Sequence, residues 1–267
     1  MSNTKKMKII IVEGISDLQF LDFLTSNYCK PFCIKPLSKT EQENPIFQGI
    51  PKDIKNIYSC QEKSLIALDF NGQENITESK INNVLNKINE KNPGLECELL
   101  IIFDNDTNPA QTAKQINTTI EKLQKKATDN EQDKYQLKSI QTLALPNETS
   151  AGCLENLIIN ILPEKSLQCF NGLISCLENS TQLLPNENTI AKLKLNYYNT
   201  FFTQQGKTDI KTSIENILKN TQKQYGKEEK DFLSYIQQNP DIKNIIDKLS
   251  IFIDKTLDVN HPPLEGG

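Results

Sequence analysis

Two aspartates that follow a run of apolar residues are the first candidates for chemistry in this chain. Residues 99–103 are all apolar, and Asp104 and Asp106 come directly after them with one residue between the two acids. A strand without polar positions is typical of a parallel sheet that is covered on both faces. Acids spaced i, i+2 on an extended chain point to the same side, and Mg²⁺ prefers oxygen ligands. The pair therefore predicts a cation site at the carboxyl end of a strand, where open α/β sheets bind their ligands.

A glutamate follows the first apolar run of the chain in the same way. Residues 7–12 predict a buried strand, which ends at Glu13 and Gly14, and Asp17 lies in the first turn of the helix expected next. If the two strands are neighbours, Glu13 meets Asp104 and Asp106 at one edge of the sheet. Clustered carboxylates repel one another unless a cation compensates. The sequence thus favours a Mg²⁺ or Mn²⁺ site and metal-assisted phosphoryl chemistry.

Each of these acids also has a purely structural interpretation. Acids at strand ends often cap helices or face solvent. Asp17 is explained equally well by the helix dipole and by a supporting role behind the metal ligands. Glu155 follows Gly152 into another helix, so it either compensates that helix dipole or supplies a further carboxylate for a second metal. Asn147 either positions a ligand or forms a turn.

The elements that position these residues alternate between strand and helix up to about residue 162. Expected strands are 7–12, 32–37, 64–70, 95–103 and 135–145, and amphipathic helices are expected around 18–24, 81–88, 116–123 and 154–161. This alternation predicts an α/β fold, with a mostly parallel sheet flanked by helices on both faces. Residues 1–162 form the predicted α/β domain.

The remainder of the chain predicts helices alone. The all-helical C-terminal region covers 163–258, and a disordered tail is expected at 259–267. Expected helices are 164–178, 187–203, 208–222, 227–238 and 240–257, with Phe201, Phe202, Ile210, Ile214, Ile217 and Leu218 in their core. Whether this region packs on the sheet or stands apart is open, and it would supply the interface for a protein partner.

Composition excludes several kinds of chemistry. All 30 basic residues are lysine and His261 is the only histidine, so Ser-His-Asp and Cys-His catalysis lack their base. A net charge of −4 argues against broad adhesion to nucleic acid, although a local lysine face is compatible with it. Seven irregularly spaced cysteines indicate reduced thiols, and no apolar run is long enough to span a bilayer. We therefore expect a cytoplasmic protein without a membrane contact.

The two acidic strand ends together resemble the Toprim domain, which topoisomerases, bacterial primases, ribosomal-RNA maturases and OLD-type nucleases share. The matching motifs are residues 9–17, with Glu13-Gly14 after the first strand, and residues 101–106. Residues 70–75, 145–147 and 152–157 are similar to the stand-alone Toprim-like proteins of bacteria and archaea. The resemblance covers roughly residues 7–162. It implies that Glu13, Asp104 and Asp106 bind Mg²⁺ and act on phosphodiester bonds of DNA or RNA.

Departures from the Toprim pattern narrow this expectation. The glycine usual a few residues after the second aspartate is replaced here by residues 107–110, which contain none. The chain has no zinc ribbon, no recognisable topoisomerase tyrosine and no ATPase loop. A metal-dependent nuclease-like hydrolase is the resulting prediction. The alternative is a non-catalytic module that binds metal or nucleotide as the partner of a separate ATPase or of a defence or repair complex.

A phosphatase of the haloacid-dehalogenase type is a further alternative, because residues 102–107 resemble the nucleophile loop of that family. Asp104 would then attack phosphate and Asp106 would act as acid and base. Asn108 stands where that loop usually carries Thr or Val, and the nucleophile strand normally comes first in that family. This reading is therefore the weaker one.

Overall fold

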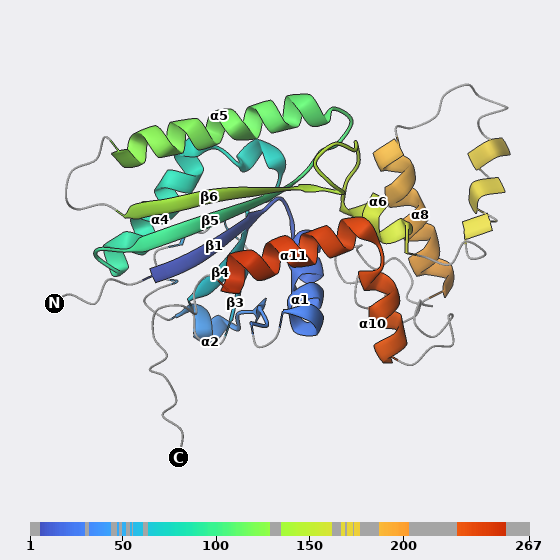
Figure 1. Cartoon of the computed structure of the whole chain (residues 1–267), viewed down its shortest axis with the longest axis horizontal. Coiled ribbons are helices and arrows are strands. Elements are labelled where there is room, and N and C mark those ends of the chain that lie inside the picture. The colour runs from blue at the N-terminus through green and yellow to red at the C-terminus, as the bar shows by residue number, and fades with distance from the viewer. Residues whose placement is uncertain are drawn as a thin grey trace, which may run out of the picture.

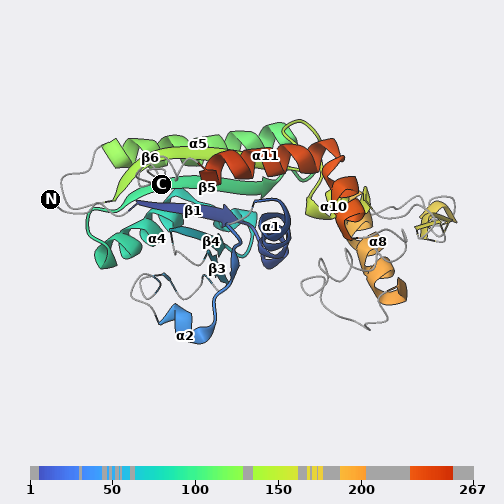
Figure 2. The same cartoon turned by 60° about the horizontal axis from the view of Figure 1, so that its bottom comes forward.

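The structure is a computed structural model of the 267-residue chain. It describes residues 6–29, 32–43, 56–60, 64–128, 135–161, 187–202 and 229–254, together with single residues between 47 and 54 and short pieces between 167 and 176. A six-stranded sheet forms its centre, with helices on both faces and further helices beyond one end of the strands (Figures 1 and 2).

The sheet is mostly parallel, as the sequence predicts. Across it the strands run β2 (Lys35–Pro36), β3 (Ile57–Ser59), β4 (Leu65–Asp69), β1 (Lys6–Val12), β5 (Glu96–Asp104) and β6 (Gln136–Leu145). The last four are mutually parallel, and β3 pairs antiparallel with both β2 and β4. β3 was not expected from the sequence, and the strand expected at 32–37 is reduced to two residues. Four prolines in residues 31–51 had obscured the pattern there.

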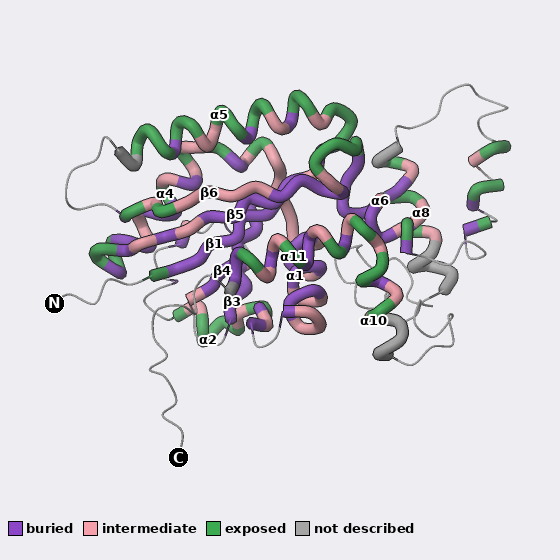
Figure 3. Tube along the Cα trace, viewed as in Figure 1, coloured by how far each residue is buried: buried purple, intermediate pink, exposed green. Residues whose placement is uncertain are grey.

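Burial on both faces explains why most positions of the central strands are apolar. Every residue of β1 after Lys6 is buried, and all five residues of β4 are buried. β1 lies between β4 and β5, with Ile11 opposite both Leu68 and Ile101. Figure 3 shows the buried trace concentrated in these strands.

One face of the sheet is covered by α4 (Glu78–Lys91) and α5 (Pro109–Thr128). α4 buries Ile81, Val84, Leu85 and Ile88, which recur at three- and four-residue spacing, as an amphipathic helix requires. These residues share a core cluster with the alternate strand positions that point to this face. The short helices α2 (Lys39–Gln42) and η1 (Gln73–Asn75) bury no residue.

The opposite face is covered by the first helix and the last. α1 (Ile15–Tyr28) and α11 (Pro240–Asp254) contribute to one core cluster, which also contains α6 (Leu154–Ile159), α8 (Glu187–Phe202) and α10 (Glu229–Gln237). Leu249 and Phe252 of α11 are fully buried and belong to the same cluster as Ile10 and Leu100 of the sheet. Of the C-terminal region, which the sequence left unplaced, α11 therefore packs on the sheet, whereas α8 and α10 lie beyond the ends of the strands (Figure 1).

A buried lysine fixes the end of α11 against the central strand. Lys8 is 3% exposed, and its ammonium group donates to the carbonyl oxygens of Phe252 and Ile253. It also lies 5.1 Å from the centre of the Phe252 ring and 4.0 Å from a carboxylate oxygen of Glu98. A cation is favourable at the carbonyl end of a helix, so Lys8 anchors the last turn of α11.

The helices expected at 187–203, 227–238 and 240–257 correspond to α8, α10 and α11. The helix expected at 208–222, the core side chains expected between 201 and 218, and the tail at 259–267 lie outside the described residues, and 164–178 is described only in pieces. The domain boundary at residue 162 stays a prediction. None of the helices within the described ranges is long and apolar enough to cross a membrane.

Candidate metal centre

Acidic residues gather where the three central parallel strands end. β4 ends at Asp69, β1 is followed by Glu13, and β5 ends at Asp104. Because β1 pairs with β4 on one side and with β5 on the other, these positions share one edge of the sheet. The Asp69 carboxylate accepts hydrogen bonds from Asn56 Nδ2 and from the backbone N–H of Asn71, both at 2.7 Å. Asp69 therefore organises the turn after β4.

Glu13 and Asp104 are joined directly. The backbone N–H of Asp104 donates to Glu13 Oε1 at 2.8 Å. The predicted meeting of the first strand end with the later one is thus present, and it uses the backbone of Asp104 rather than its carboxylate. That carboxylate stays available to other partners.

Asp17 caps the helix that follows Glu13. Its Oδ2 accepts the backbone N–H of Gly14 at 2.9 Å, which closes the first turn of α1. The side chain is only 8% exposed and its charge acts on both Glu13 and Asp104. The capping role is thus present in the geometry, and the same carboxylate adds to the negative charge of the cluster.

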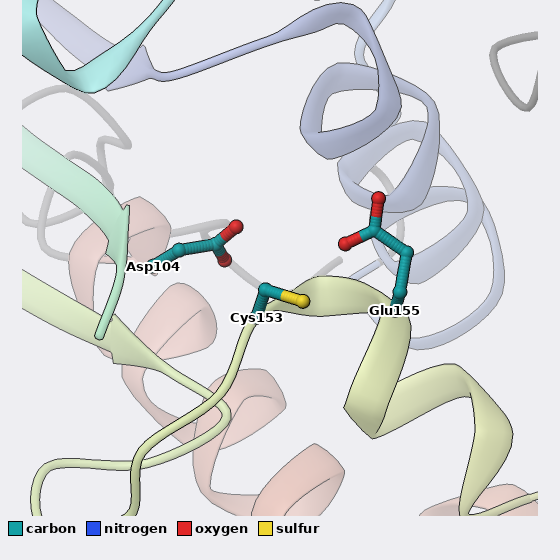
Figure 4. Close-up of side chains that lie close together, drawn as sticks. All are labelled: Asp104, Cys153 and Glu155. Atoms are coloured by element: carbon teal, nitrogen blue, oxygen red, sulfur yellow. The ribbon is translucent and has the colours of Figure 1, made fainter. Parts of the chain in front are cut away.

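Asp104 meets the start of α6 with its side chain. Its Oδ1 accepts the backbone N–H of Leu154 at 3.0 Å. Ligand atoms of Asp104, Cys153 and Glu155 all lie within 4.8 Å of one another. Figure 4 shows these three side chains close together. In the part of the chain that the structure describes, this is the group of acidic, cysteine and histidine side chains that is close enough to hold one ion.

The prediction that the chain is extended from Asp104 to Asp106, with both carboxylates on the same side, is wrong. β5 ends at Asp104, and Asp106 has a left-handed backbone with φ of 48°. Its carbonyl oxygen accepts the N–H of Gly152 at 2.7 Å, and its side chain is exposed. Asn105 between the two acids is buried and donates from Nδ2 to the carbonyl oxygens of Asn147 and Ser150. The turn therefore bends Asp106 away from the strand direction, although its charge still acts on Glu13.

Burial makes the ionised form of this cluster costly. It raises the pKa of Glu13 to about 8, with further contributions from the charges of Asp17 and Asp106. It raises the pKa of Asp17 to about 7, and that of Asp104 well above its usual range, where Asp17, Glu13 and Glu155 add repulsion. Carboxylates crowded in this way bind a compensating cation favourably.

The donor set suits a hard cation. Burial and the charges of Glu155 and Asp104 raise the pKa of the Cys153 thiol, and its Sγ donates to Asn156 Oδ1 at 3.0 Å. Thiolates suit soft metals, whereas hard cations prefer oxygen ligands. The carboxylates of Asp104 and Glu155 offer oxygen atoms, the kind of ligand that hard cations such as Mg²⁺ prefer, and Glu13 is not part of this group.

Among the described residues, the exposed lysine Lys192 acts electrostatically on this cluster. Lys192 lies on α8, whose buried Ala191 and Leu195 belong to the side that packs against α6. Its positive charge lowers the pKa of Glu13 and Asp17, and the carboxylates of Glu155, Asp104 and Asp106 raise its own pKa. It forms no ion pair within 4.0 Å with a described carboxylate.

Sequence reasoning did not find Lys192 or Cys153. Cys153 lies between Gly152 and Glu155, which the sequence analysis did name, so its position near the site could have been inferred. Lys192 belongs to a helix of unremarkable composition, and only the packing of α8 on α6 brings it to the carboxylates.

Comparison with known proteins assigns the chain to a family. The family model described as "Protein of unknown function (DUF3226)" matches residues 7–254. The chain belongs to the DUF3226 family. The match runs from β1 to α11, so the DUF3226 unit includes the sheet and the C-terminal helix that covers it.

Among solved structures, the DUF3226 chain is similar to a crystal structure of hypothetical protein PH0156 from Pyrococcus horikoshii OT3. The two are 13% identical with a TM-score of 0.53, and the similarity covers 91% of this chain and 99% of that chain. At this identity the likeness concerns the fold alone. No curated protein matches the sequence.

Proposed function

We propose that this DUF3226 protein is a Toprim-like, Mg²⁺-binding phosphodiester hydrolase that acts on nucleic acid in the cytoplasm. The observation that carries the proposal is the hydrogen bond between Glu13 and the backbone of Asp104, which brings the acid after the first strand to the acid that ends β5. The Toprim resemblance rests on these two strand ends. No disulfide joins the described cysteines, which fits a reducing compartment.

The residues have distinct proposed roles. Asp104 and Glu155 hold the cation, and Asp106 adds negative charge at the exposed rim. When bound, the ion would polarise a phosphate oxygen and lower the pKa of a water molecule. With the cation bound, the ionised carboxylate of Glu13 would accept the proton of the attacking water as a general base. Lys192 contacts the phosphate from the side of α8.

The test combines metal binding with cleavage. Purified protein is titrated with Mn²⁺ by calorimetry, and then incubated with single- and double-stranded DNA and RNA in the presence of Mg²⁺ or Mn²⁺. We expect binding and cleavage by the wild type and loss of both in Asp104→Asn. Glu121→Gln is the matched control, because it removes one exposed negative charge from the middle of α5.

Two outcomes would change the proposal. Cleavage that survives Asp104→Asn would contradict the assigned centre. Mn²⁺ binding that depends on Asp104, without cleavage of any substrate, would favour the alternative of a non-catalytic module that acts through a protein partner.

A further inference from the structure

The loop between β6 and α6 connects the candidate metal centre to the C-terminal helix. Asn147 Nδ2 donates to Asp241 Oδ1 in the first turn of α11 at 3.0 Å. The other end of the same amide, Oδ1, accepts the backbone N–H groups of Thr149 and Ser150 at 3.1 and 2.8 Å. One side chain thus folds the loop and ties it to α11.

The same loop also reaches the acidic strand end. Asn105 donates to the carbonyl oxygens of Asn147 and Ser150 at 2.7 and 3.0 Å. Gly152 then pairs with the backbone of Asp106, and two residues later Leu154 donates to the Asp104 carboxylate. The conformation of the loop therefore sets where α6 begins, and with it where Glu155 stands relative to Asp104.

α11, to which this loop is bonded, is anchored in the hydrophobic core. Ile242, Ile245 and Leu249 are at most 1% exposed in the core under the helix. A second contact, between Lys248 and Glu148, joins the loop to the same helix about two turns further along. Asp241 is itself fixed, because its N–H donates to Asn239 Oδ1 at 3.0 Å.

We propose that Asp241 is a positioning residue for the candidate metal centre: through Asn147 it holds the 146–152 loop, so that the C-terminal helix sets the separation of Asp104 and Glu155. The part of this inference that concerns cation affinity rests on the proposed function. The part that concerns how Asp241 holds the loop is independent of that function. Replacing a residue that hydrogen-bonds to a metal ligand and orients it typically lowers metal affinity by about 10- to 100-fold.

The experiment compares three single variants. Asp241→Ala removes the acceptor for Asn147, Asp241→Asn keeps an acceptor oxygen, and Asp247→Ala removes an exposed acid elsewhere on α11. We expect Mn²⁺ affinity to fall about tenfold in Asp241→Ala only. Hydrogen–deuterium exchange of residues 146–157 should become faster in Asp241→Ala, while Asp241→Asn and Asp247→Ala stay close to the wild type.

A charge swap separates positioning from general stability. Asn147→Asp places two carboxylates against each other and should loosen the loop, yet it keeps an acceptor for the N–H groups of Thr149 and Ser150. The double variant N147D/D241N restores one donor and one acceptor, and it should return exchange and Mn²⁺ affinity toward wild-type values. This rescue would not follow if Asp241 only stabilised the start of α11.

The outcomes are distinct. Unchanged exchange at 146–157 in Asp241→Ala, or no recovery in N147D/D241N, would overturn the inference. A wild type that binds no Mn²⁺ would contradict the proposed function, and faster exchange in Asp241→Ala with recovery in the double variant would still support the positioning of the loop by Asp241.

Discussion

The backbone N–H of Asp104 donates a 2.8 Å hydrogen bond to the carboxylate of Glu13, although 91 positions separate the two residues. The bond forms because β1 and β5 are parallel neighbours whose carboxyl ends lie at the same edge of the sheet. It satisfies Glu13 while leaving the carboxylate of Asp104 to face Leu154 and Glu155. Glu13 therefore binds the backbone of Asp104, and the carboxylate of Asp104 points on toward the start of α6.

The first prediction separates the two aspartates of the Asp-x-Asp motif. Asp104→Asn should weaken Mn²⁺ binding by more than about 100-fold, because Asp104 contributes a carboxylate oxygen to the group that can hold one ion. Asp106→Asn should have a clearly smaller effect, since Asp106 is exposed and turned by its left-handed backbone. Calorimetric titration measures both affinities. Equal losses in the two variants would contradict this ranking.

The second prediction concerns pH and stability without metal. Burial raises the pKa of Glu13 to about 8 and of Asp17 to about 7, against ordinary values of 4.5 and 3.8. Between those limits the folded state binds more protons than the unfolded state, so the free energy of unfolding should fall as pH rises from about 4 to 8. Urea denaturation at pH 5, 6, 7 and 8 checks the sign.

Bound metal should counteract the fall in the free energy of unfolding at high pH. A cation binds the ionised carboxylates of the folded state and stabilises it by mass action. The stabilisation by 10 mM Mg²⁺ should therefore be larger at pH 8 than at pH 5. Glu13→Gln should flatten the metal-free pH dependence, whereas Glu121→Gln should leave it unchanged. A stability that rises between pH 5 and 8 without metal would contradict the burial argument.

The third prediction concerns Gly152, which links Asp106 to α6. Its φ of 141° is disfavoured for residues with a side chain, and a Cβ there would lie 3.1 Å from Pro146 Cδ and 3.2 Å from Asn156 Oδ1. Gly152→Ala should destabilise the protein by about 1–3 kcal/mol and weaken Mn²⁺ binding, because it displaces the start of α6. Gly172→Ala is the control, since nothing lies within 4 Å of a Cβ there. Equal thermal shifts in the two variants would speak against the strain argument.

The fourth prediction concerns Lys192. Lys192→Gln removes a charge that lowers the pKa of Glu13 and Asp17, so the acidic limb of any pH–rate profile should move to higher pH. Mn²⁺ affinity should stay the same or increase, because a positive charge beside the site is lost. Oligonucleotide affinity should fall, with the salt dependence of binding reduced by about one unit. Lys194→Gln, on the same helix, should leave all three quantities unchanged.

The fifth prediction tests whether the C-terminal helix folds with the sheet. Phe252 is fully buried between α11 and the sheet, so Phe252→Ala should cost about 3–5 kcal/mol. The sheet and α11 should unfold in one transition. Circular dichroism and site-specific hydrogen exchange measure this unfolding. Ile251→Ala is a fitting control, because Ile251 is 54% exposed on the same helix. Two separate transitions would show that α11 is an independent unit.

The sequence by itself determined the class of the fold and the main strands. Continuous apolar runs at β1, β4 and β5 have to be buried on both faces, and the helices between them force parallel connections. Once the strands are parallel, acids at their ends share one edge. Glu13 and Asp104 could therefore be placed together before any contact was known.

Tertiary structure alone decided the rest of the candidate centre. The turn at Asp106 depends on its backbone pairing with Gly152, which lies 46 positions away, and periodicity contains no signal for such a pairing. The packing of α8 against α6 brings the charge of Lys192 near the carboxylates, and the packing of α11 on the sheet brings Asp241 to Asn147 of the 146–152 loop. Local sequence sets the period of an apolar face, but the packing of the whole chain selects the partner of that face. Only the folded structure therefore shows which C-terminal residues lie near these carboxylates and their loop.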